Sequence, residues 1–392
     1  MTEDTHPSTH PPLPPTTEDD RISWLRLLRS HRVGTATFYR LLSEHDTAQA
    51  ALLALPEIAR AAGVSDYAVC PPGVAEAEWQ RGQNARAQMI CISDAAYPAM
   101  LRDIPDPPPF IWVMGDPAHL LRPCISIVGA RNASSLGTRM AKALASDLSE
   151  AGFIIVSGLA RGIDTAAHLA ALGGGTVAVM AGGVDMFYPA ENTRLGEDIA
   201  KTGARLSEQP MGLIPQARHF PRRNRLVSGL SAAVIVVEAA TRSGSLITAR
   251  NAADQGRDVL AVPGHPFDAR AAGSNMLLRD GATLIRSAQD VIEALAPPAP
   301  PRALHAEQTP GTLPEPRTRP EAEKRSLAQN ARLHSLILDR LGPSPLAEDQ
   351  LIRDLGAPAH RVTPALVDLE LDGHIQRDPG GLLRRNGTER AS

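Results

Sequence analysis

The feature that most constrains the fold is a series of short apolar segments between residues 124 and 285, each followed by a turn and a helical pattern. Strands are predicted at 124–128, 153–156, 176–180, 204–207, 233–237, 259–262 and 282–285. Continuous apolar strands that alternate with helices are typical of a parallel sheet covered on both faces. The sequence therefore predicts a doubly wound, Rossmann-like α/β core.

Residues 21–60 carry apolar side chains three and four positions apart, the spacing of amphipathic helices. Gly34 separates the first two of these helices, and short helices around a glycine turn resemble a helix-hairpin-helix or SAM-type domain. Backbone amides in such a turn can hold a DNA phosphate, whereas most small helical bundles only pack against their neighbours. Both interpretations stay open for this segment.

The chain after residue 295 begins with a proline-dense stretch that has few large apolar residues, which predicts an extended linker. Residues 324–385 follow with the pattern of three helices and a glycine-turned β-hairpin, which is that of a winged helix-turn-helix. The third helix carries Asp368, Glu370 and Asp372, whose charge repels phosphates. Contact with duplex DNA and contact with a protein partner are both open for this module.

These patterns divide the chain into five predicted parts. They are an acidic, proline-rich, disordered tail at 1–20, a helical domain at 21–90, an extended Rossmann-like domain at 91–292, a linker at 293–323 and a winged helix at 324–387. A further strand at 110–114 is expected in the proline-rich lead-in to the Rossmann-like core.

Charge and composition narrow the class of protein. The formal net charge is −3 over 392 residues, but residues 121–290 hold 18 Lys and Arg against 14 Asp and Glu. No segment approaches the roughly 18 apolar residues of a membrane span, and the acidic start lacks the apolar region of a signal peptide. Cys70, Cys91 and Cys124 are too far apart for a disulfide framework or a zinc site. We expect a soluble, cytoplasmic protein.

Four segments at the predicted sheet edge carry candidate binding residues, because ligands of open parallel sheets bind beyond the carboxyl ends of the strands. Segments 129–137 and 157–164 are strand-to-helix turns with one arginine near glycines; 218–225 has four arginines and no acid; 243–248 is rich in hydroxyl side chains. The candidates are Arg131, Gly158, Arg161, Gly162, Arg218, Phe220, Arg222, Arg223, Arg225, Ser243 and Ser245.

Each candidate also has a purely structural interpretation. Glycines at strand-to-helix turns are routine in doubly wound folds, and Phe220 could belong to the core. Arg222 and Arg225 could pair with Glu208 or Glu238. A run of arginines around an aromatic residue, without a compensating acid, nevertheless favours an anion-binding surface.

The motifs of several enzyme classes are missing from the sequence. It has no GxGxxG dinucleotide fingerprint, no P-loop, no HExxH, no CxxC pair and no GxSxG. Asp164 and His168 lie four residues apart on one helix and could be an acid–base pair, but a helix-capping aspartate with a packed histidine is the commoner arrangement. We therefore predict no enzyme, no catalytic residue, no cofactor and no metal.

Residues 97–290 closely resemble the DNA-processing protein A family (DprA, also called Smf). The resemblance is carried by YPAMLRDIPDPPPFIWVMG at 97–115, SIVGARNASSLG at 126–137, IVSGLARGIDTAAH at 155–168, TVAVMAGGVDMFYPAEN at 176–192, HFPRRNRLVSGLS at 219–231, VVEAATRSGSLITARNA at 236–252 and VPGHPF at 262–267. So many motifs in the order of the family, over about half of the chain, make the resemblance specific.

The resemblance implies a non-enzymatic single-stranded DNA-binding protein of natural transformation and recombination. Such proteins protect incoming DNA in the cytoplasm, help to load the RecA recombinase and usually act as dimers. By motif, Arg131, Gly158, Arg161 and Gly162 should lie in a phosphate pocket, and Arg218 and the segment 220–225 along the same groove, with Phe220 facing a base. Many relatives have a lysine beside the YP motif, where this chain has 190–192, with Arg194 as the nearest candidate contact.

Two other functions are weighed beside this one. Nucleotide phosphoribohydrolases share a related Rossmann-like fold, and segment 238–249 is distantly similar to their phosphate loop and glutamate, although the PGGxGTxxE signature is missing. In that alternative Glu238 would be catalytic. A protein that acts mainly as an interaction scaffold through its winged helix is the third hypothesis.

Overall fold

The computed structural model describes residues 14–295, 327–341, 346–357, 359–378 and 382–385. The chain forms two compact units, Met1–Pro301 and Arg302–Ser392, and each is described by itself. The predicted disordered tail falls mostly, and the predicted linker almost entirely, outside the described residues.

The first unit is built on a nine-stranded sheet with the order β1-β2-β6-β5-β4-β3-β7-β8-β9. In the part of this order that runs β6-β5-β4-β3-β7-β8-β9, every pair of neighbouring strands is parallel, which confirms the predicted doubly wound sheet. Their bounds are β3 Cys124–Val128, β4 Ile154–Ser157, β5 Thr176–Val179, β6 Ala204–Ser207, β7 Ala233–Val236, β8 Asp258–Ala261 and β9 Thr283–Leu284. Each lies within one residue of its predicted position at either end.

Two antiparallel strands extend the sheet beyond β6. β2 (Phe110–Gly115) pairs with β6, and β1 (Gln88–Cys91) pairs with β2. The strand at β2 was predicted, whereas β1 was not, because a four-residue segment of mixed polarity gives no periodic signal.

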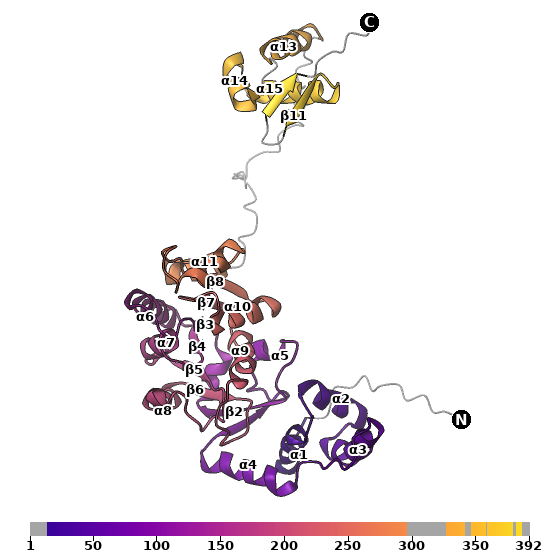
Figure 1. The fold of residues 1–392 in the computed structure, drawn as a ribbon, viewed down its shortest axis with the longest axis vertical. Coiled ribbons are helices and arrows are strands. Elements are labelled where there is room, and N and C mark those ends of the chain that lie inside the picture. The colour runs from indigo at the N-terminus through magenta and orange to yellow at the C-terminus, as the bar shows by residue number, and fades with distance from the viewer. Residues whose placement is uncertain (1–13, 296–326, 342–345, 358, 379–381, 386–392) are drawn as a thin grey trace, which may run out of the picture. The chain divides into compact units, whose positions relative to one another are not determined.

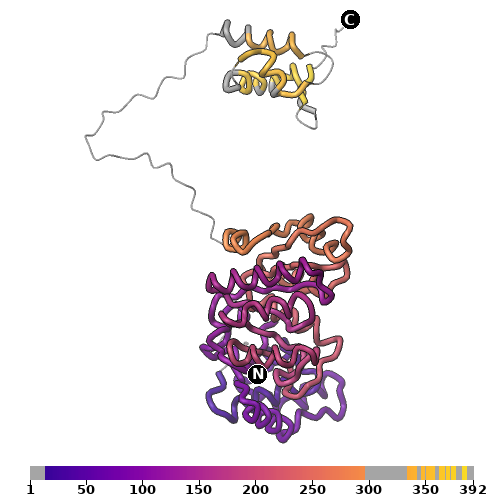
Figure 2. The backbone as a smooth tube through the Cα atoms, turned by 90° about the vertical axis from the view of Figure 1, so that its left-hand side faces the viewer, coloured from indigo at the N-terminus to yellow at the C-terminus, as the bar shows by residue number. Residues whose placement is uncertain are grey.

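Helices cover both faces of the sheet (Figure 1). On one face, α6 (Ser135–Glu150), α7 (Ile163–Ala171) and α12 (Ala288–Leu295) pack on Ile125, Ile127 and Ile155. Figure 2 looks onto this side and shows the helices one above another across the strands. On the other face, α5 (Ala99–Arg102), α9 (His219–Gly229) and α10 (Gly244–Asp254) pack on Val156, Val177 and Val234. The helices α8 (Thr193–Thr202) and α11 (Ala272–Arg279) and the short turns η1 (Pro117–Leu121) and η2 (Ala190–Asn192) complete the α/β part.

Four helices precede the sheet: α1 (Glu18–Arg29), α2 (Thr35–His45), α3 (Ala48–Ala61) and α4 (Pro72–Asn84). α1 begins three residues before the predicted start of the helical domain, because Thr17 caps it in a capping box and three acids occupy its first turn. α4 was not singled out from the sequence, which has few large apolar residues in this segment.

The helical domain and the sheet share one core. Glu78 of α4 accepts hydrogen bonds from Arg29 of α1 and from the indole of Trp112 in β2, at 2.9 and 3.0 Å. The surrounding cluster joins Trp24, Phe38 and Leu42 of the helices to Phe110 and Met180 of the α/β part. These helices are therefore packed against the sheet rather than tethered to it.

The second unit is a winged helix, as predicted. α13 (Leu327–Arg340), α14 (Glu348–Leu355) and α15 (Ala359–Leu371) enclose a small core with Ile337, Leu366 and Leu383. β10 (Leu346–Ala347), β12 (Leu382–Arg385) and β11 (Ile375–Asp378) form its antiparallel sheet. Asp368 and Asp372 are exposed, Asp368 on α15 and Asp372 just beyond its end. Among the residues that the structure describes, no helix in either unit is long and apolar enough to cross a membrane.

Candidate nucleic-acid interface

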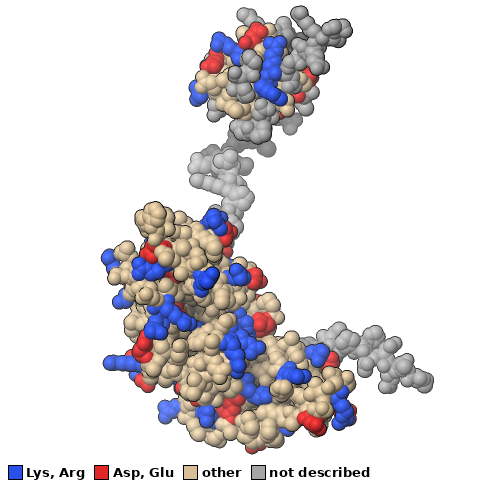
Figure 3. Space-filling view, in the orientation of Figure 1, with Lys and Arg blue, Asp and Glu red and all other residues tan. Residues whose placement is uncertain are grey.

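An open pocket of about 530 Å³ lies at the carboxyl edge of the sheet. It is lined by the loops that follow β3, β4 and β7, together with the first turns of α9 and α10. The chain runs from β3 toward β4 on one side and returns to β7 on the other, so this is the switch point where open α/β sheets bind ligands. Figure 3 shows a hollow on the α/β unit with Lys and Arg side chains around it.

Arg131 meets two aromatic rings at one side of the pocket: Phe220 from the first turn of α9, and Tyr188 from the loop after β5. The guanidinium carbon of Arg131 lies 5.4 Å from the centre of the Phe220 ring, which is the geometry of a cation–π contact. The ring of Tyr188 lies 5.4 Å from that of Phe220, centre to centre, at 60°. Arg131 is exposed and Phe220 is half-buried, so a planar group and an anion can reach this cluster together.

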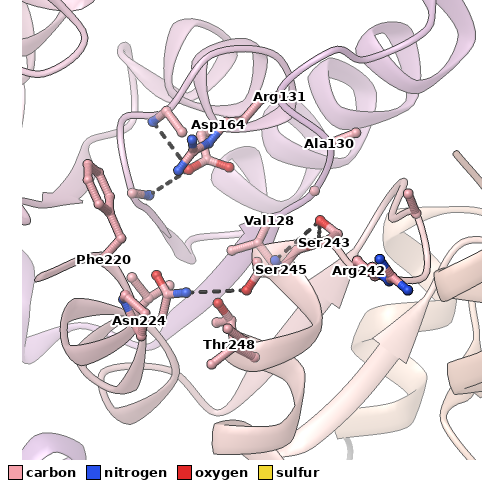
Figure 4. A pocket seen from close by; sticks show the side chains of 18 of the residues that line it. Val128, Ala130, Arg131, Asp164, Phe220, Asn224, Arg242, Ser243, Ser245 and Thr248 are labelled. Atoms are coloured by element: carbon pink, nitrogen blue, oxygen red, sulfur yellow. Dashed lines mark hydrogen bonds between the residues drawn. The ribbon is translucent and has the colours of Figure 1, made fainter. Parts of the chain in front are cut away.

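The N-terminus of α10 forms the opposite side of the pocket (Figure 4). Ser243 caps the helix, and its hydroxyl lies 2.7 Å from that of Ser245. Asn224 of α9 donates to the carbonyl oxygen of Gly244 at 3.3 Å. The exposed side chain of Arg242 lines the pocket beside this turn and forms no ion pair with another described residue.

The arginine-rich segment is helical and not the predicted loop. It forms the start of α9, with Arg218 at the N-cap, so its four arginines point to different sides. Arg218 and Arg222 are exposed, whereas Arg225 pairs with Glu208 of the β6 end and with Asp106. The structure thus favours the ion-paired alternative for Arg225.

The loops after β3, β4 and β7 and the first turns of α9 and α10 form what we call the rim of the sheet. Arg223 is buried and links parts of this rim to one another. Its Nη1 donates to the carbonyl oxygens of Gly158 at 2.6 Å and of Val179 at 2.5 Å, which joins α9 to the ends of β4 and β5. Burial lowers the pKa of Arg223 to about 10, so the side chain stays charged at neutral pH. Arg223 and Arg225 therefore do not present free guanidinium groups to solvent.

The glycines of the second turn serve the backbone. A Cβ on Gly158 would lie 2.3 Å from the Arg223 guanidinium, and one on Gly162, where φ is +76°, would lie 2.3 Å from the Ala130 carbonyl oxygen. Asp164 accepts from the amides of Gly158 and Ala160, so it fixes this turn instead of capping α7 as predicted.

The other two predicted arginines, Arg161 and Arg194, differ in their position relative to the pocket. Arg161 is exposed, lines a small cleft with Arg131 and Phe220, and lies 3.5 Å from the exposed Glu191. Arg194 is exposed in α8 and lines neither the cleft nor the pocket. Sequence reasoning missed Tyr188, Asn224 and Arg242. The YP motif was a signal for Tyr188, and the position of Arg242 one residue before a helix cap was a signal for that arginine.

Glu238, the residue on which the hydrolase alternative depends, has an internal role. Its carboxylate accepts from the amide of Ser134 at 2.9 Å and from the Ser134 hydroxyl. It therefore fixes the start of α6, where Ser134 is the N-cap. The geometry does not favour the hydrolase hypothesis.

His168 is packed in the core, as the more common interpretation predicted. Its Nδ1 lies 2.8 Å from Thr176 Oγ1, and this hydroxyl already donates to the Ile155 carbonyl oxygen. Nδ1 therefore donates to the Thr176 hydroxyl. Burial, with a smaller effect of Arg223, lowers the pKa of His168 to about 3.

We expect this histidine to make the fold less stable in acid. Between pH 6.5 and about 3 the unfolded chain binds a proton at His168 that the folded chain does not, so stability falls as the pH falls. His168→Asn keeps an N–H donor near Nδ1 but cannot titrate. The free energy of unfolding, measured with urea at several pH values in this range, should change with pH more steeply in the wild type than in the variant, by about 1.4 kcal/mol per pH unit. Equal slopes would contradict the assignment.

The fold and this rim define a class: a Rossmann-like protein with an arginine- and aromatic-lined pocket at the switch point of its sheet. The sequence profile of the DNA recombination-mediator protein A family matches residues 88–296. Profiles of the DprA-like N-terminal HHH domain and the DprA winged helix domain match residues 18–80 and 320–381. The chain belongs to the DNA recombination-mediator protein A family.

Named relatives agree with this assignment. The DNA processing protein DprA of Bacillus subtilis is 44% identical over 227 residues, which are 57% of this chain and 75% of that protein. Protein Smf of Escherichia coli is 36% identical over 298 residues, which are 74% of this chain and 75% of that protein.

Solved structures are similar as well. DNA processing protein A from Streptococcus pneumoniae superposes with a TM-score of 0.53 at 39% identity, over 61% of this chain and 86% of that one. DNA processing protein A from Helicobacter pylori, solved in a study of its single-stranded DNA binding mode, gives a TM-score of 0.50 at 31% identity, over 54% of this chain and 97% of that one.

Proposed function

We propose that the chain is a non-enzymatic protein that binds single-stranded DNA along the carboxyl rim of its sheet, protects incoming DNA during natural transformation and recombination, and helps to load RecA. The observation that carries this proposal is the cluster of Arg131, Phe220 and Tyr188 beside an open pocket. A guanidinium next to aromatic rings matches the repeating unit of a single strand, which is one phosphate and one base.

The proposed phosphate contacts are the exposed arginines of the rim. They are Arg131, Arg161, Arg218, Arg222 and Arg242. The hydroxyls of Ser243 and Ser245 and the start of α10 add neutral donors, which suit a phosphate oxygen. Arg223 and Arg225 support this surface from inside, and Arg194 is not among the proposed contacts because it lines neither the pocket nor the cleft. Glu191 is exposed, so a phosphate can displace it from Arg161 at little cost.

The family relationship supports the finer parts of the proposal. The study of the Helicobacter pylori relative concerns binding of single-stranded DNA, and we extend that ligand to this chain. We further propose a homodimer, a cytoplasmic location and RecA as partner, with the domain division predicted above. For the winged helix, the exposed acidic residues Asp368 on α15 and Asp372 just beyond its end favour a protein contact over duplex DNA.

Direct binding measurements test this function. Labelled single- and double-stranded oligonucleotides should be titrated with the full chain over a salt series. We expect tighter binding of the single strand and an affinity that falls steeply with salt, because each phosphate contact releases counterions. Equal affinity for both forms, or an affinity that does not respond to salt, would contradict the proposal.

The proposed RecA partnership has a separate test. RecA-dependent pairing of a single strand with its duplex should be faster when the strand is first coated with the full chain. If the purified chain binds single strands but leaves the rate of pairing unchanged, the proposed role in RecA loading would be wrong. The proposed binding of single-stranded DNA would then still stand.

A further inference from the structure

The loop between β8 and α11 holds the most exposed large apolar side chain among the described residues of the first unit. Phe267 is 94% exposed, and its ring lies 5.6 Å from that of His265, centre to centre, at 39°. An apolar ring that stays in water contributes none of the stabilisation that its burial would provide. A single exposed ring is common on protein surfaces, so its position relative to the proposed binding residues decides whether it suggests a ligand contact.

The loop that carries Phe267 is well ordered by hydrogen bonds. Asn275 of α11 accepts from the amide of Gly264 and donates to its carbonyl oxygen. Asp268 holds Arg270 through two side-chain contacts of 3.1 and 3.0 Å, and the Asp268 amide donates to His265. The hydrogen bonds within this loop therefore fix the backbone that carries the exposed Phe267 ring.

The sheet topology places this loop at the same edge of the sheet as the proposed DNA contacts. β8 is parallel to β7, so the loop after β8 lies next to the loop that carries Arg242 and Ser243. Arg270, three residues after Phe267, lines the pocket itself. The rim loops thus follow the order of β5, β4, β3, β7 and β8, with Tyr188 at the first end, arginines between, and Phe267 at the other.

The surroundings of Phe267 favour nucleic acid over a protein partner. The other exposed side chains of segment 263–270 are small or polar, so the ring is not part of a continuous apolar patch within its loop. Arginines that line the pocket, Arg242 and Arg270, lie on the same side of the sheet. An isolated ring beside cationic side chains suits a strand of stacked bases and phosphates.

We propose that the Phe267 ring, backed by His265, is a second base-stacking site for single-stranded DNA at the β8 end of the rim. The inference rests on the proposed function. Four spacings between neighbouring strands separate the β5 and β8 ends, about 19 Å in all, so a strand of several nucleotides is needed to reach both sites. A shorter oligonucleotide can occupy only the pocket side.

The test compares oligothymidylates of about 4 and about 20 nucleotides by fluorescence anisotropy with the full chain. Phe267→Ala should weaken binding of the longer oligonucleotide by about tenfold and leave the shorter one unchanged. The salt dependence should stay the same, because stacking releases no counterions. Leu53→Ala, which removes an 82% exposed apolar side chain from α3, is the matched control and should change neither affinity.

A second variant gives a direct signal. Phe267→Trp should keep the wild-type affinity, and the added tryptophan fluorescence should be quenched by the longer oligonucleotide. Wild-type binding of both oligonucleotides by Phe267→Ala would overturn the inference, as would a variant that changes only the oligomeric state on a sizing column. If the wild type binds neither oligonucleotide, the proposed function fails together with the inference. If Arg131→Ala weakens binding and Phe267→Ala does not, only the second site is wrong.

Discussion

Arg223→Ala is expected to lower the free energy of unfolding by about 3–5 kcal/mol. The substitution removes a buried cation and leaves the carbonyl oxygens of Gly158 and Val179 without their donor. It also removes the nearby positive charge that offsets the effect of burial on Asp164, whose pKa burial raises. Urea unfolding followed by circular dichroism measures the loss.

The neighbouring arginine provides the control for this prediction. Arg222 is exposed on the same helix, so Arg222→Ala should change the free energy of unfolding by less than about 0.5 kcal/mol. If the two variants were equally stable, the assignment of Arg223 to the framework of the rim would be wrong.

The second large effect is expected for DNA binding. Arg131→Ala should weaken binding of single-stranded DNA at least tenfold while the unfolding curve stays unchanged, because Arg131 is exposed and its guanidinium lies over the Phe220 ring at the surface. The slope of log affinity against log salt should decrease by about one, which is the signature of one lost phosphate contact.

Arg139→Ala is the matched variant for the Arg131 experiment. Arg139 is an exposed arginine of α6, lies away from the pocket lining and pairs with no described acid. It should retain nearly all of the affinity, since distant surface charges are screened by salt. A similar loss in both variants would mean that net charge, and not the rim, determines binding.

The fold of the first unit was largely predictable because its signal is local. Seven short strands, most of them buried and each followed by a glycine or serine turn, leave a doubly wound sheet as the simplest arrangement. β1 and α4 were not predicted, because contacts with distant residues and not local patterns define them. β1 is defined by its pairing with Trp112 and the neighbouring residues of β2, and α4 by the contacts of Glu78.

The candidate site was predicted less completely, since sequence does not show which way a side chain points. The turns after β3, β4 and β7 were placed correctly on one rim. In the arginine-rich segment, however, the helical period of α9 turns Arg222 outward and Arg223 inward, and the sequence does not set apart these two adjacent arginines. Tyr188 reaches Phe220 across 32 positions of sequence, a contact that local patterns cannot reveal.

The carboxylate of Glu238 has an electrostatic consequence for the rim. It neutralises the positive end of the α6 dipole from within the protein, since Ser134 and its amide both donate to it. At the start of α10 the cap is the Ser243 hydroxyl, and the first turn of this helix holds no acidic residue. If a polyanion binds along this edge as proposed, the two helix ends would attract it unequally, the start of α6 less than the start of α10, and we expect this asymmetry to favour one orientation of the strand.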